Sequence, residues 1–359
     1  MAKKFIVACG GTGGHTFPGL AVARELKARG HEVVVWDSGR SIESSVMKAW
    51  DGPTFSTGAR QLRPLNAFAN LLSFFRCKRE IKRFQPDVLL AMGSYSSLPP
   101  VIAAAMRRVP VVLHEANTVP GRAVEVLSRY AKEVAISFPE TKDFLPKVST
   151  VLTGLPVRAE IAGCSRFDAM PKNNTFCVFV TGGSQGAHRV NELMSEALVL
   201  LKQDLARKEI KTRLLVIHQT GAADEQMVAK RYEEAGITAR VNAFEHEMGR
   251  AFATADLVVA RAGASTCFEL ALVGKPAFFI PLPSAMRNHQ HFNAQSFVRA
   301  GAADEGTQAE LTPRTLANYL FHKIQNPASL QDKADAMRTV AAPDAAAKVA
   351  DLVERHAKG

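Results

Sequence analysis

At residues 176–186 the chain reads Phe176-Cys177-Val178-Phe179-Val180-Thr181-Gly182-Gly183-Ser184-Gln185-Gly186, an uninterrupted apolar run that ends in a glycine-rich turn. Near its start the chain has the same plan, Phe5-Ile6-Val7-Ala8-Cys9-Gly10-Gly11-Thr12-Gly13-Gly14-His15. A helical pattern follows each turn. Glycines let the backbone approach an anion closely, and the N–H groups at the start of the next helix attract it. Two such turns predict two α/β domains that face each other across a cleft.

Short continuous apolar runs alternate with helical patterns along the whole chain. This alternation predicts parallel sheets covered by helices on both faces, that is, two Rossmann-like doubly wound domains. A helix is expected over Gly19–Arg29. The expected strands are 5–9, 31–36, 87–92, 109–113 and 133–136 in the first half, and 175–180, 213–218, 239–243, 257–260 and 277–281 in the second.

Composition shifts suggest where the domains meet. We expect an N-terminal domain over 1–158, a linker over 159–174 that ends in Pro171-Lys172-Asn173-Asn174, and a C-terminal domain over 175–343. A helix is expected within the last stretch, 344–359, and the pattern does not identify the domain on which it packs. With 359 residues the chain is long enough for two cores.

Cysteine usage and hydropathy narrow the class of protein. The five cysteines are scattered without any C-x-x-C spacing, which favours neither a disulfide framework nor a zinc knuckle. Three of them, Cys9, Cys177 and Cys267, lie in or beside apolar runs and are expected in the core. The apolar run that follows Lys4 is too short for a signal peptide, and no stretch approaches the roughly 18 apolar residues of a membrane span. These features predict a cytosolic or peripheral protein.

The net charge of +11 is uneven, since residues 1–158 hold 22 lysines and arginines against 12 acidic residues. Arg60–Arg83 alone has seven basic residues and one acid, and Leu65, Phe68, Leu72 and Phe75 recur within it at helical spacing. An apolar stripe among basic residues suits an anionic membrane surface. A core-facing helix with a solvated basic end is the alternative. Nucleic acid is not favoured, because no recognition fold or stacking-aromatic pattern is present.

Three strand-to-helix junctions carry candidate chemistry. His15 ends the first glycine turn and is either a helix-start residue or a general base, since histidine titrates near neutral pH. Ser184 lies at the tip of the second turn, where backbone N–H groups suit a phosphate. The third junction is Arg261–Glu269, where small residues open a helix and Glu269 could accept the hydroxyls of a ribose.

The sequence does not favour two other types of site. A nicotinamide dehydrogenase would use Asp37 at the second strand, but Thr16 stands where the third glycine of its fingerprint belongs. A zinc site of His289 and His291 has no cysteine or carboxylate nearby in sequence to complete it.

Six motifs, in this order, resemble the MurG family of peptidoglycan N-acetylglucosaminyltransferases within glycosyltransferase family 28. They are Gly10–His15 with Pro18-Gly19, His114-Glu115-Ala116-Asn117, Pro156-Val157-Arg158, Gly182–Gly186, Arg261–Glu269 and His289-Gln290. The resemblance implies the GT-B fold and inverting transfer of N-acetylglucosamine from UDP-N-acetylglucosamine to the MurNAc 4-hydroxyl of lipid I, undecaprenyl-diphosphate-MurNAc-pentapeptide, giving lipid II. It implies no cofactor and no catalytic metal. It also implies a peripheral position on the cytoplasmic face of the bacterial membrane, with other cell-wall enzymes as candidate partners.

The resemblance also assigns residues. His15 is the candidate base, Glu269 the expected ribose ligand, and the uracil is read mainly by backbone beside Phe244–Met248. The remaining substrate-binding candidates are Thr12, Gly13, Gly14, Asn117, Arg158, Ser184, Gln185, Glu245, Ala264, Ser265, Thr266 and Gln290. Glu245 departs from the family, in which an aliphatic residue is common, and Leu155 stands where the family usually has asparagine.

Two alternatives stay open at this point. A UDP-sugar 2-epimerase shares the two-domain architecture and would act on the donor alone. A membrane-surface scaffold that merely binds nucleotide would release no UDP when an acceptor is present.

Overall fold

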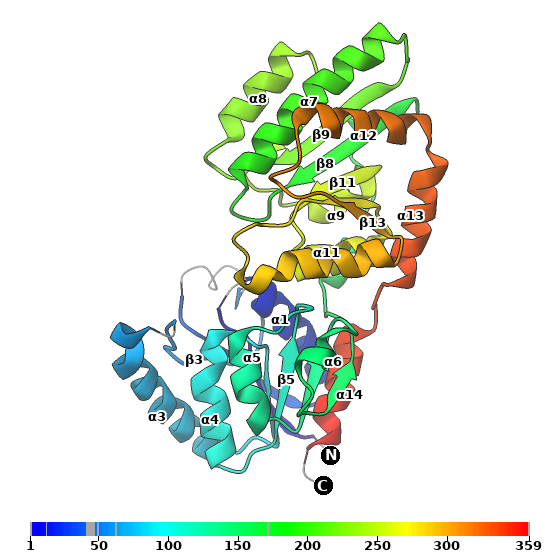
Figure 1. Ribbon diagram of the computed structural model, residues 1–359. Helices are drawn as coiled ribbons and strands as arrows, with labels where there is room; N and C mark the ends of the chain where they lie inside the picture. The colour runs from blue at the N-terminus through cyan, green and yellow to red at the C-terminus, as the bar shows by residue number, and fades with distance from the viewer. Residues whose placement is uncertain are drawn as a thin grey trace. The chain divides into compact units, whose positions relative to one another are not determined.

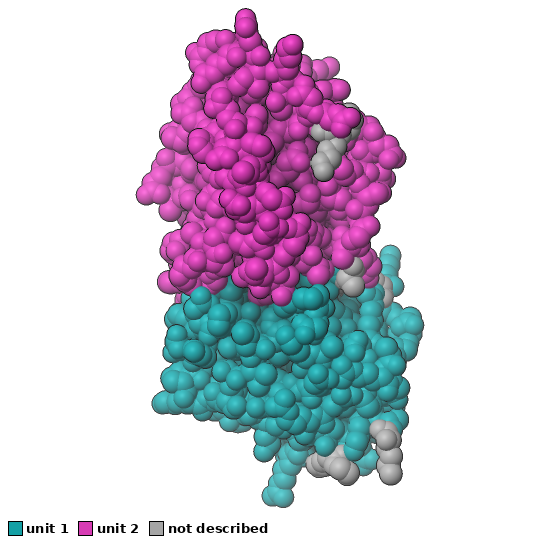
Figure 2. All heavy atoms as spheres, turned by 90° about the vertical axis from the view of Figure 1, so that its right-hand side faces the viewer, with its two compact units in different colours: residues 1–158, 342–359 teal, residues 159–341 magenta. Residues whose placement is uncertain are grey.

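The computed structural model describes residues 2–11, 13–40, 47–48, 50–61, 63–170 and 173–357. It divides into two compact units, coloured separately in Figure 2. Unit 1 comprises Met1–Arg158 and Ala342–Gly359, and unit 2 comprises Ala159–Ala341. The first unit is therefore discontinuous in sequence.

Unit 1 is built on a parallel sheet, which has seven strands among the described residues. In sheet order these are β3 (Thr54–Ser56), β2 (Glu32–Asp37), β1 (Lys4–Ala8), β4 (Val88–Ala91), β5 (Val111–Glu115), β6 (Glu133–Ile136) and β7 (Thr150–Leu152). Val7 of β1 pairs with Val35 on one side and Leu90 on the other. Chain order reverses between β1 and β4, which is the position where doubly wound sheets bind ligands.

Helices cover both faces of this sheet, which explains why its central strands are continuously apolar. Phe5 and Val7 face one core with α1 (Gly13–Ala28) and α14 (Ala345–Arg355), whereas Ile6 and Ala8 face another core on the opposite side. The other helical elements in the described part of this unit are η1 (Pro64–Asn66), α3 (Ala67–Phe84), η2 (Tyr95–Ser97), α4 (Leu98–Met106), α5 (Arg122–Leu127), η3 (Ser128–Tyr130) and α6 (Thr141–Phe144). Residues of α3, α4 and α5 complete the second core.

Unit 2 repeats the plan with a parallel sheet of six strands among the described residues. In sheet order these are β10 (Thr238–Asn242), β9 (Arg213–Gln219), β8 (Thr175–Thr181), β11 (Leu257–Ala260), β12 (Ala277–Phe279) and β13 (Ala303–Glu305). Chain order reverses between β8 and β11, and Val180 pairs there with Val259. The turn after β8 and the junction after β11 therefore flank the switch point of this sheet.

The helices of unit 2 lie on both sides of its sheet, and α7 packs against α12 (Figure 1). They are η4 (Ala159–Ile161), α7 (His188–Arg207), α8 (Glu225–Glu234), α9 (Met248–Thr254), α10 (Ala264–Val273), η5 (Met286–Asn288), α11 (His289–Arg299), α12 (Pro313–Gln325) and α13 (Ala328–Thr339). Cys177 and Cys267 are buried here, and Cys9 is buried in unit 1, as the sequence predicts. No described helix combines the length and the apolar character needed to cross a bilayer.

The structure groups one segment differently from the sequence expectation and assigns another that the sequence left open. The described part of 159–174, expected as a linker, packs into unit 2, because buried Phe167 donates its N–H to Thr254 Oγ1 at 2.9 Å and takes the guanidinium groups of Arg240 and Arg250 over its ring. The C-terminal helix, whose packing the sequence left open, belongs to unit 1. There Arg29, directly after α1, donates to Asp351 and Glu354 at 2.6 and 2.7 Å.

Helix α1 also begins earlier than expected, at Gly13 rather than Gly19. Pro18 lies inside it. A proline is uncommon in the second turn of a helix, since its ring removes one N–H donor. The earlier start brings Gly13, Gly14 and His15 into the first turn of the helix.

Candidate active site

The glycine turn after β1 is held in place by residues that follow neighbouring strands. The hydroxyls of Ser94 and Ser96, beyond β4, both donate to the carbonyl of Gly10, the latter at 2.6 Å. Arg40 donates to the Gly11 carbonyl at 3.2 Å. A Cβ on Gly10 would lie 2.6 Å from the backbone nitrogen of Ser38, so only glycine fits there. Thr12 lies outside the described residues.

His15 stands in the first turn of α1, half-buried, and interacts electrostatically with His114 at the end of β5. Complete burial of His114, with a smaller contribution from nearby His15, lowers its pKa to about 4, against the opposite effect of the hydrogen bond to Gly154. Nε2 of His114 lies 3.4 Å from the carbonyl oxygen of Gly154. Because His114 stays neutral at physiological pH, it adds no positive charge beside His15.

Asn117 is positioned by the buried carboxylate of Glu115. The backbone N–H of Asn117 donates to Glu115 Oε1 at 2.8 Å, and that of Gly121 donates to Oε2 at 2.9 Å. Burial raises the pKa of Glu115 to about 7, against the opposite effect of these donors. Arg158, which follows β7, lies with its guanidinium 4.9 Å from the ring centre of Phe17 on α1. The described candidates of unit 1 therefore all follow carboxyl ends of its strands.

In unit 2 the glycine turn packs against the end of β9. Gly186 has a φ of +73°, and a Cβ there would lie 2.0 Å from the carbonyl oxygen of Thr220. Ser184 and Gln185 are exposed at the tip. Helix α7 begins just beyond, and its N-cap, Ala187, supplies no side-chain hydrogen bond. The N–H groups at this helix start are thus available for an anion.

A polar chain that the sequence did not predict underlies this turn. His188 Nδ1 lies 2.8 Å from Asp224 Oδ1, and Asn191 donates to Asp224 Oδ2 at 2.7 Å. His218 lies between Asn191 Oδ1 and the hydroxyl of Tyr232, at 3.1 and 2.9 Å. The hydrogen bond to Asp224 raises the pKa of His188, whereas burial lowers that of His218 to about 3. The residues come from three separate segments, so their sequence spacing gives no signal of the contact.

The third junction leads from β11 into α10. Gly263 is the N-cap, and a Cβ there would meet no atom within 4 Å, so the space before the helix is open. Ala264 is buried, Ser265 and Thr266 are half-buried, and Glu269 is buried further along the helix. Arg261 has a structural role instead, since it donates to the carbonyls of Ile280 and Pro281 and to Gln308, at 2.7 to 2.9 Å.

The side chains of two further candidates, Glu245 and Gln290, accept hydrogen bonds from nearby backbone N–H groups. The carboxylate of Glu245 is turned inward, where Arg240 donates to it at 2.8 Å and the N–H of Glu247 does so at 2.8 Å. Gln290 Oε1 accepts the N–H of Leu282 at 2.9 Å. Nearby, His291 pairs with Glu305 at 2.6 Å. Among the described residues no group of three or more metal-ligating side chains occurs.

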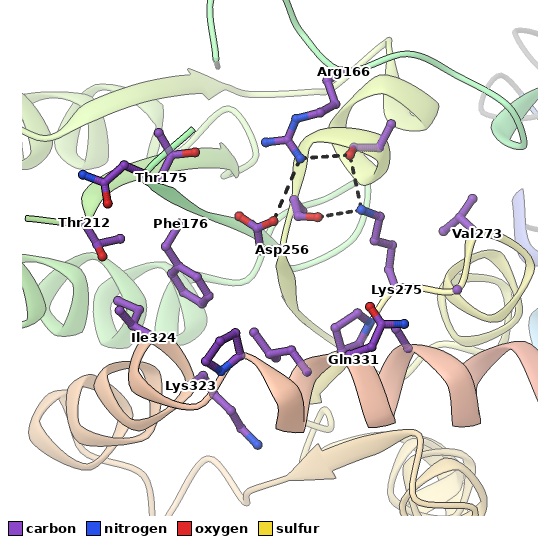
Figure 3. A pocket seen from close by; sticks show the side chains of 18 of the residues that line it. Arg166, Thr175, Phe176, Thr212, Asp256, Val273, Lys275, Lys323, Ile324 and Gln331 are labelled. Atoms are coloured by element: carbon purple, nitrogen blue, oxygen red, sulfur yellow. Dashed lines mark hydrogen bonds and ion pairs between the residues drawn. The ribbon is translucent and has the colours of Figure 1, made fainter. Parts of the chain in front are cut away.

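A cavity of about 620 Å³ lies at the opposite edge of the unit 2 sheet, where β8, β11 and β12 begin (Figure 3). Two basic side chains that line it, Lys275 and Arg166, make structural contacts. Lys275 Nζ donates to the carbonyls of Ala253 and Ala255, at 3.2 and 2.7 Å, and Arg166 reaches the Ala253 carbonyl and Asp256. Cations at a helix C-terminus stabilise its carbonyl groups, here those of α9. We therefore do not assign this cavity to the candidate active site.

Comparison with known proteins gives the family. Residues 5–136 match the glycosyltransferase family 28 N-terminal domain, and residues 177–352 match its C-terminal domain. The chain belongs to glycosyltransferase family 28. It is 36% identical over 359 residues to a protein of Geobacter metallireducens named UDP-N-acetylglucosamine–N-acetylmuramyl-(pentapeptide) pyrophosphoryl-undecaprenol N-acetylglucosamine transferase, with 97% of each chain covered.

Solved structures agree with this membership. The crystal structure of Acinetobacter baumannii MurG is 30% identical, with a TM-score of 0.79, and the match covers 99% of this chain and all of that one. The GT-B fold predicted from the sequence is confirmed. A further similar structure, from Listeria monocytogenes, is named a putative UDP-N-acetylglucosamine 2-epimerase. It has a TM-score of 0.75 at 12% identity, and the match covers 99% of this chain and 97% of that one. That likeness concerns the fold alone.

Proposed function

We propose that this family 28 enzyme transfers N-acetylglucosamine from UDP-N-acetylglucosamine to the MurNAc 4-hydroxyl of lipid I, giving lipid II with inversion at the anomeric carbon. The observation that carries the proposal is the near-full-length similarity to transferases named for this reaction. The epimerase alternative is weaker, because it rests on a fold likeness at 12% identity.

Unit 2 is the proposed donor domain. The helix starts of α7 and α10 flank its switch point, and their N–H groups offer positive potential to the diphosphate of UDP. Buried Glu269 is the proposed ribose ligand, and the backbone of the loop around Glu245 is the proposed uracil contact. The other proposed donor contacts of this unit are Ser184, Gln185, Ala264, Ser265, Thr266 and Gln290.

His15 is the proposed general base. As the MurNAc 4-oxygen attacks the anomeric carbon of N-acetylglucosamine, the imidazole takes the hydroxyl proton, and the bond from that carbon to the diphosphate oxygen breaks. UDP leaves with the bonding electron pair, which the helix N-termini stabilise. The further proposed substrate contacts in unit 1 are Thr12, Gly13, Gly14, Asn117 and Arg158.

Helix α3 is the proposed membrane contact, on the cytoplasmic face of the cell membrane. Its inner side is in the core through Cys77 and Ile81, whereas its outer side carries apolar side chains that are half or more exposed. These are Phe68, Leu71, Leu72 and Phe75, with Leu65 in the preceding turn. This exposure favours a surface role for the stripe over a core-facing one. Arginines surround it, which suits an anionic surface that also presents the lipid-linked acceptor.

The test measures UDP release from UDP-N-acetylglucosamine with and without a lipid I analogue. We expect release only when the acceptor is present, together with formation of a disaccharide product. Release or epimerisation of the donor alone would contradict the proposal.

The same assay tests the base. His15→Ala should lower kcat by about a hundredfold or more while the Kd for UDP stays unchanged. Turnover at the wild-type rate would remove His15 from this role.

A further inference from the structure

The side-chain amide of Gln219 joins two loops at the carboxyl edge of the unit 2 sheet. Gln219 is the last residue of β9 and is buried. Its Nε2 donates to the Gly183 carbonyl at 2.8 Å and to Thr181 Oγ1 at 3.2 Å, and its Oε1 accepts the N–H of Glu245 at 3.0 Å. A carbonyl only accepts and an N–H only donates, so these partners fix the orientation of the amide.

Each of the two loops is also held by hydrogen bonds of its own. In the glycine turn, Gly186 donates to the Gly183 carbonyl at 3.0 Å, and Gly186 packs on the backbone of Thr220. In the other loop, the buried Glu245 carboxylate takes Arg240 and Asn242, at 2.8 and 3.0 Å. Gln219 contributes a single side chain that bonds to both loops. Its bonds to Thr181 and Glu245 are buried and its bond to Gly183 is partly buried, so these bonds are costly to leave unmade.

The distance between these loops matters for a ligand that contacts both. In the proposed function the glycine turn takes the diphosphate and the 243–248 loop takes the uracil, so UDP spans them. A ligand that binds two sites gains affinity only when the sites are held at the separation that the ligand requires. Uridine or inorganic diphosphate alone has no such requirement.

We propose that Gln219 is a positioning residue for the donor, which sets the separation of the diphosphate turn and the uracil loop and so favours a uridine diphosphate over its parts. This inference rests on the proposed function. Glu245 then contributes to donor binding through its backbone. The contact of its carboxylate with Arg240 holds the loop where the Glu245 N–H can donate to Gln219 Oε1.

The experiment compares Gln219→Glu and Gln219→Met with the wild type in binding UDP, uridine and inorganic diphosphate. Gln219→Glu keeps the acceptor for Glu245 but sets a carboxylate against the Gly183 carbonyl, and Gln219→Met removes all three hydrogen bonds. Both should raise the Kd for UDP and the KM for UDP-N-acetylglucosamine about tenfold, with the Kd for either part and kcat changed about twofold or less. Gln203→Glu, at an exposed position on α7, is the control for charge.

The outcomes separate the possibilities. Equal weakening of all three ligands would indicate general damage to unit 2 and overturn the inference, as would wild-type affinity for UDP in both variants. If the wild type itself neither binds UDP nor turns over UDP-N-acetylglucosamine, the proposed function is wrong. That result is distinct from a failure of the Gln219 inference, which requires a wild type that binds UDP.

Discussion

At the scale of single residues, Glu115, which holds the loop that carries Asn117, makes the stability of the fold depend on pH. Its pKa rises from an ordinary 4.5 to about 7 in the folded protein, because burial disfavours the charged form. The folded state therefore keeps a proton that the unfolded chain loses, and stability falls as pH rises from about 4.5 to 7. We predict that Glu115→Gln gains about 2 kcal/mol relative to the wild type on going from pH 5 to pH 8. Urea unfolding of both proteins at the two pH values measures this, and parallel pH profiles would contradict it.

Single residues also show which parts of the candidate site could be predicted from the sequence. Gly186 and Gly10 could be assigned to tight turns because their chain neighbours already define strand, turn and helix. The partners of Glu115 are also close in sequence. Gln219 and Asp224 are different, since each bonds to groups some 30 or more residues away, such as Gly183 and His188. Such contacts follow from the sheet order and the loop paths, which no local pattern contains.

At the scale of secondary-structure elements, burial explains which strands could be predicted. The central strands, such as β1 and β8, are buried on both faces and are therefore continuous apolar runs. The expected list omitted β3, β7 and β13, which lie at sheet edges and are three residues long. An edge strand pairs on one side only, so a short one leaves a weak apolar signal.

Helix α3 yields the prediction that belongs to this scale. The groove beside it, about 500 Å³ in volume, is lined by Leu72 and Phe75 together with Arg60, Arg76 and Arg79. We predict that Phe75→Glu lowers binding to vesicles containing phosphatidylglycerol by about tenfold or more, since it replaces an exposed apolar side chain that would enter the membrane with a charge that the anionic surface repels. Activity on a water-soluble acceptor should be unchanged.

Phe144→Glu is the matched control, because this exposed phenylalanine of unit 1 lies on α6 rather than α3. Vesicle sedimentation at low and high salt is the measurement. Equal loss in both variants would show that net charge alone governs binding, and undiminished binding by Phe75→Glu would remove α3 from the membrane contact.

At the scale of the whole molecule, unit 1 depends on a segment that follows unit 2 in sequence. Val349, Leu352 and Val353 of α14 are buried in the core that also holds Phe5 and Val7 of β1. Removing residues 342–359 should therefore destabilise unit 1 by at least about 4 kcal/mol, from the lost burial of three aliphatic side chains. Both tryptophans, Trp36 and Trp50, lie in unit 1, so their fluorescence follows it alone. UDP binding by unit 2 should persist, and simultaneous loss of both signals would contradict separate stabilities.

The two units should also respond differently to mild acid. Each buries a neutral histidine, His114 with a pKa of about 4 and His218 with a pKa of about 3. Because the unfolded chain binds the proton near pH 6.5 and the folded one does not, each histidine costs about 2 kcal/mol of stability as pH falls from 7.5 to 5. In unit 1 this loss is opposed by Glu115, whose raised pKa makes the folded state more stable over the same interval. Among the described residues of unit 2 with resolved shifts no carboxyl pKa is raised. The raised pKa of His188 acts in the same direction as that of Glu115, but this side chain is exposed, so solvent screening keeps its contribution small.

We therefore predict that unit 2 loses about 2 kcal/mol between pH 7.5 and 5 while unit 1 changes little, because the opposing pKa shifts in unit 1 nearly cancel. Urea unfolding followed by tryptophan fluorescence reports unit 1, and protection by UDP identifies the transition of unit 2. His218→Gln should flatten the pH dependence of the unit 2 transition, whatever its effect on absolute stability. In Glu115→Gln the cancellation is removed, so the tryptophan transition should become acid-sensitive. A tryptophan transition that keeps its wild-type pH dependence in that variant would show that other groups set the response of unit 1.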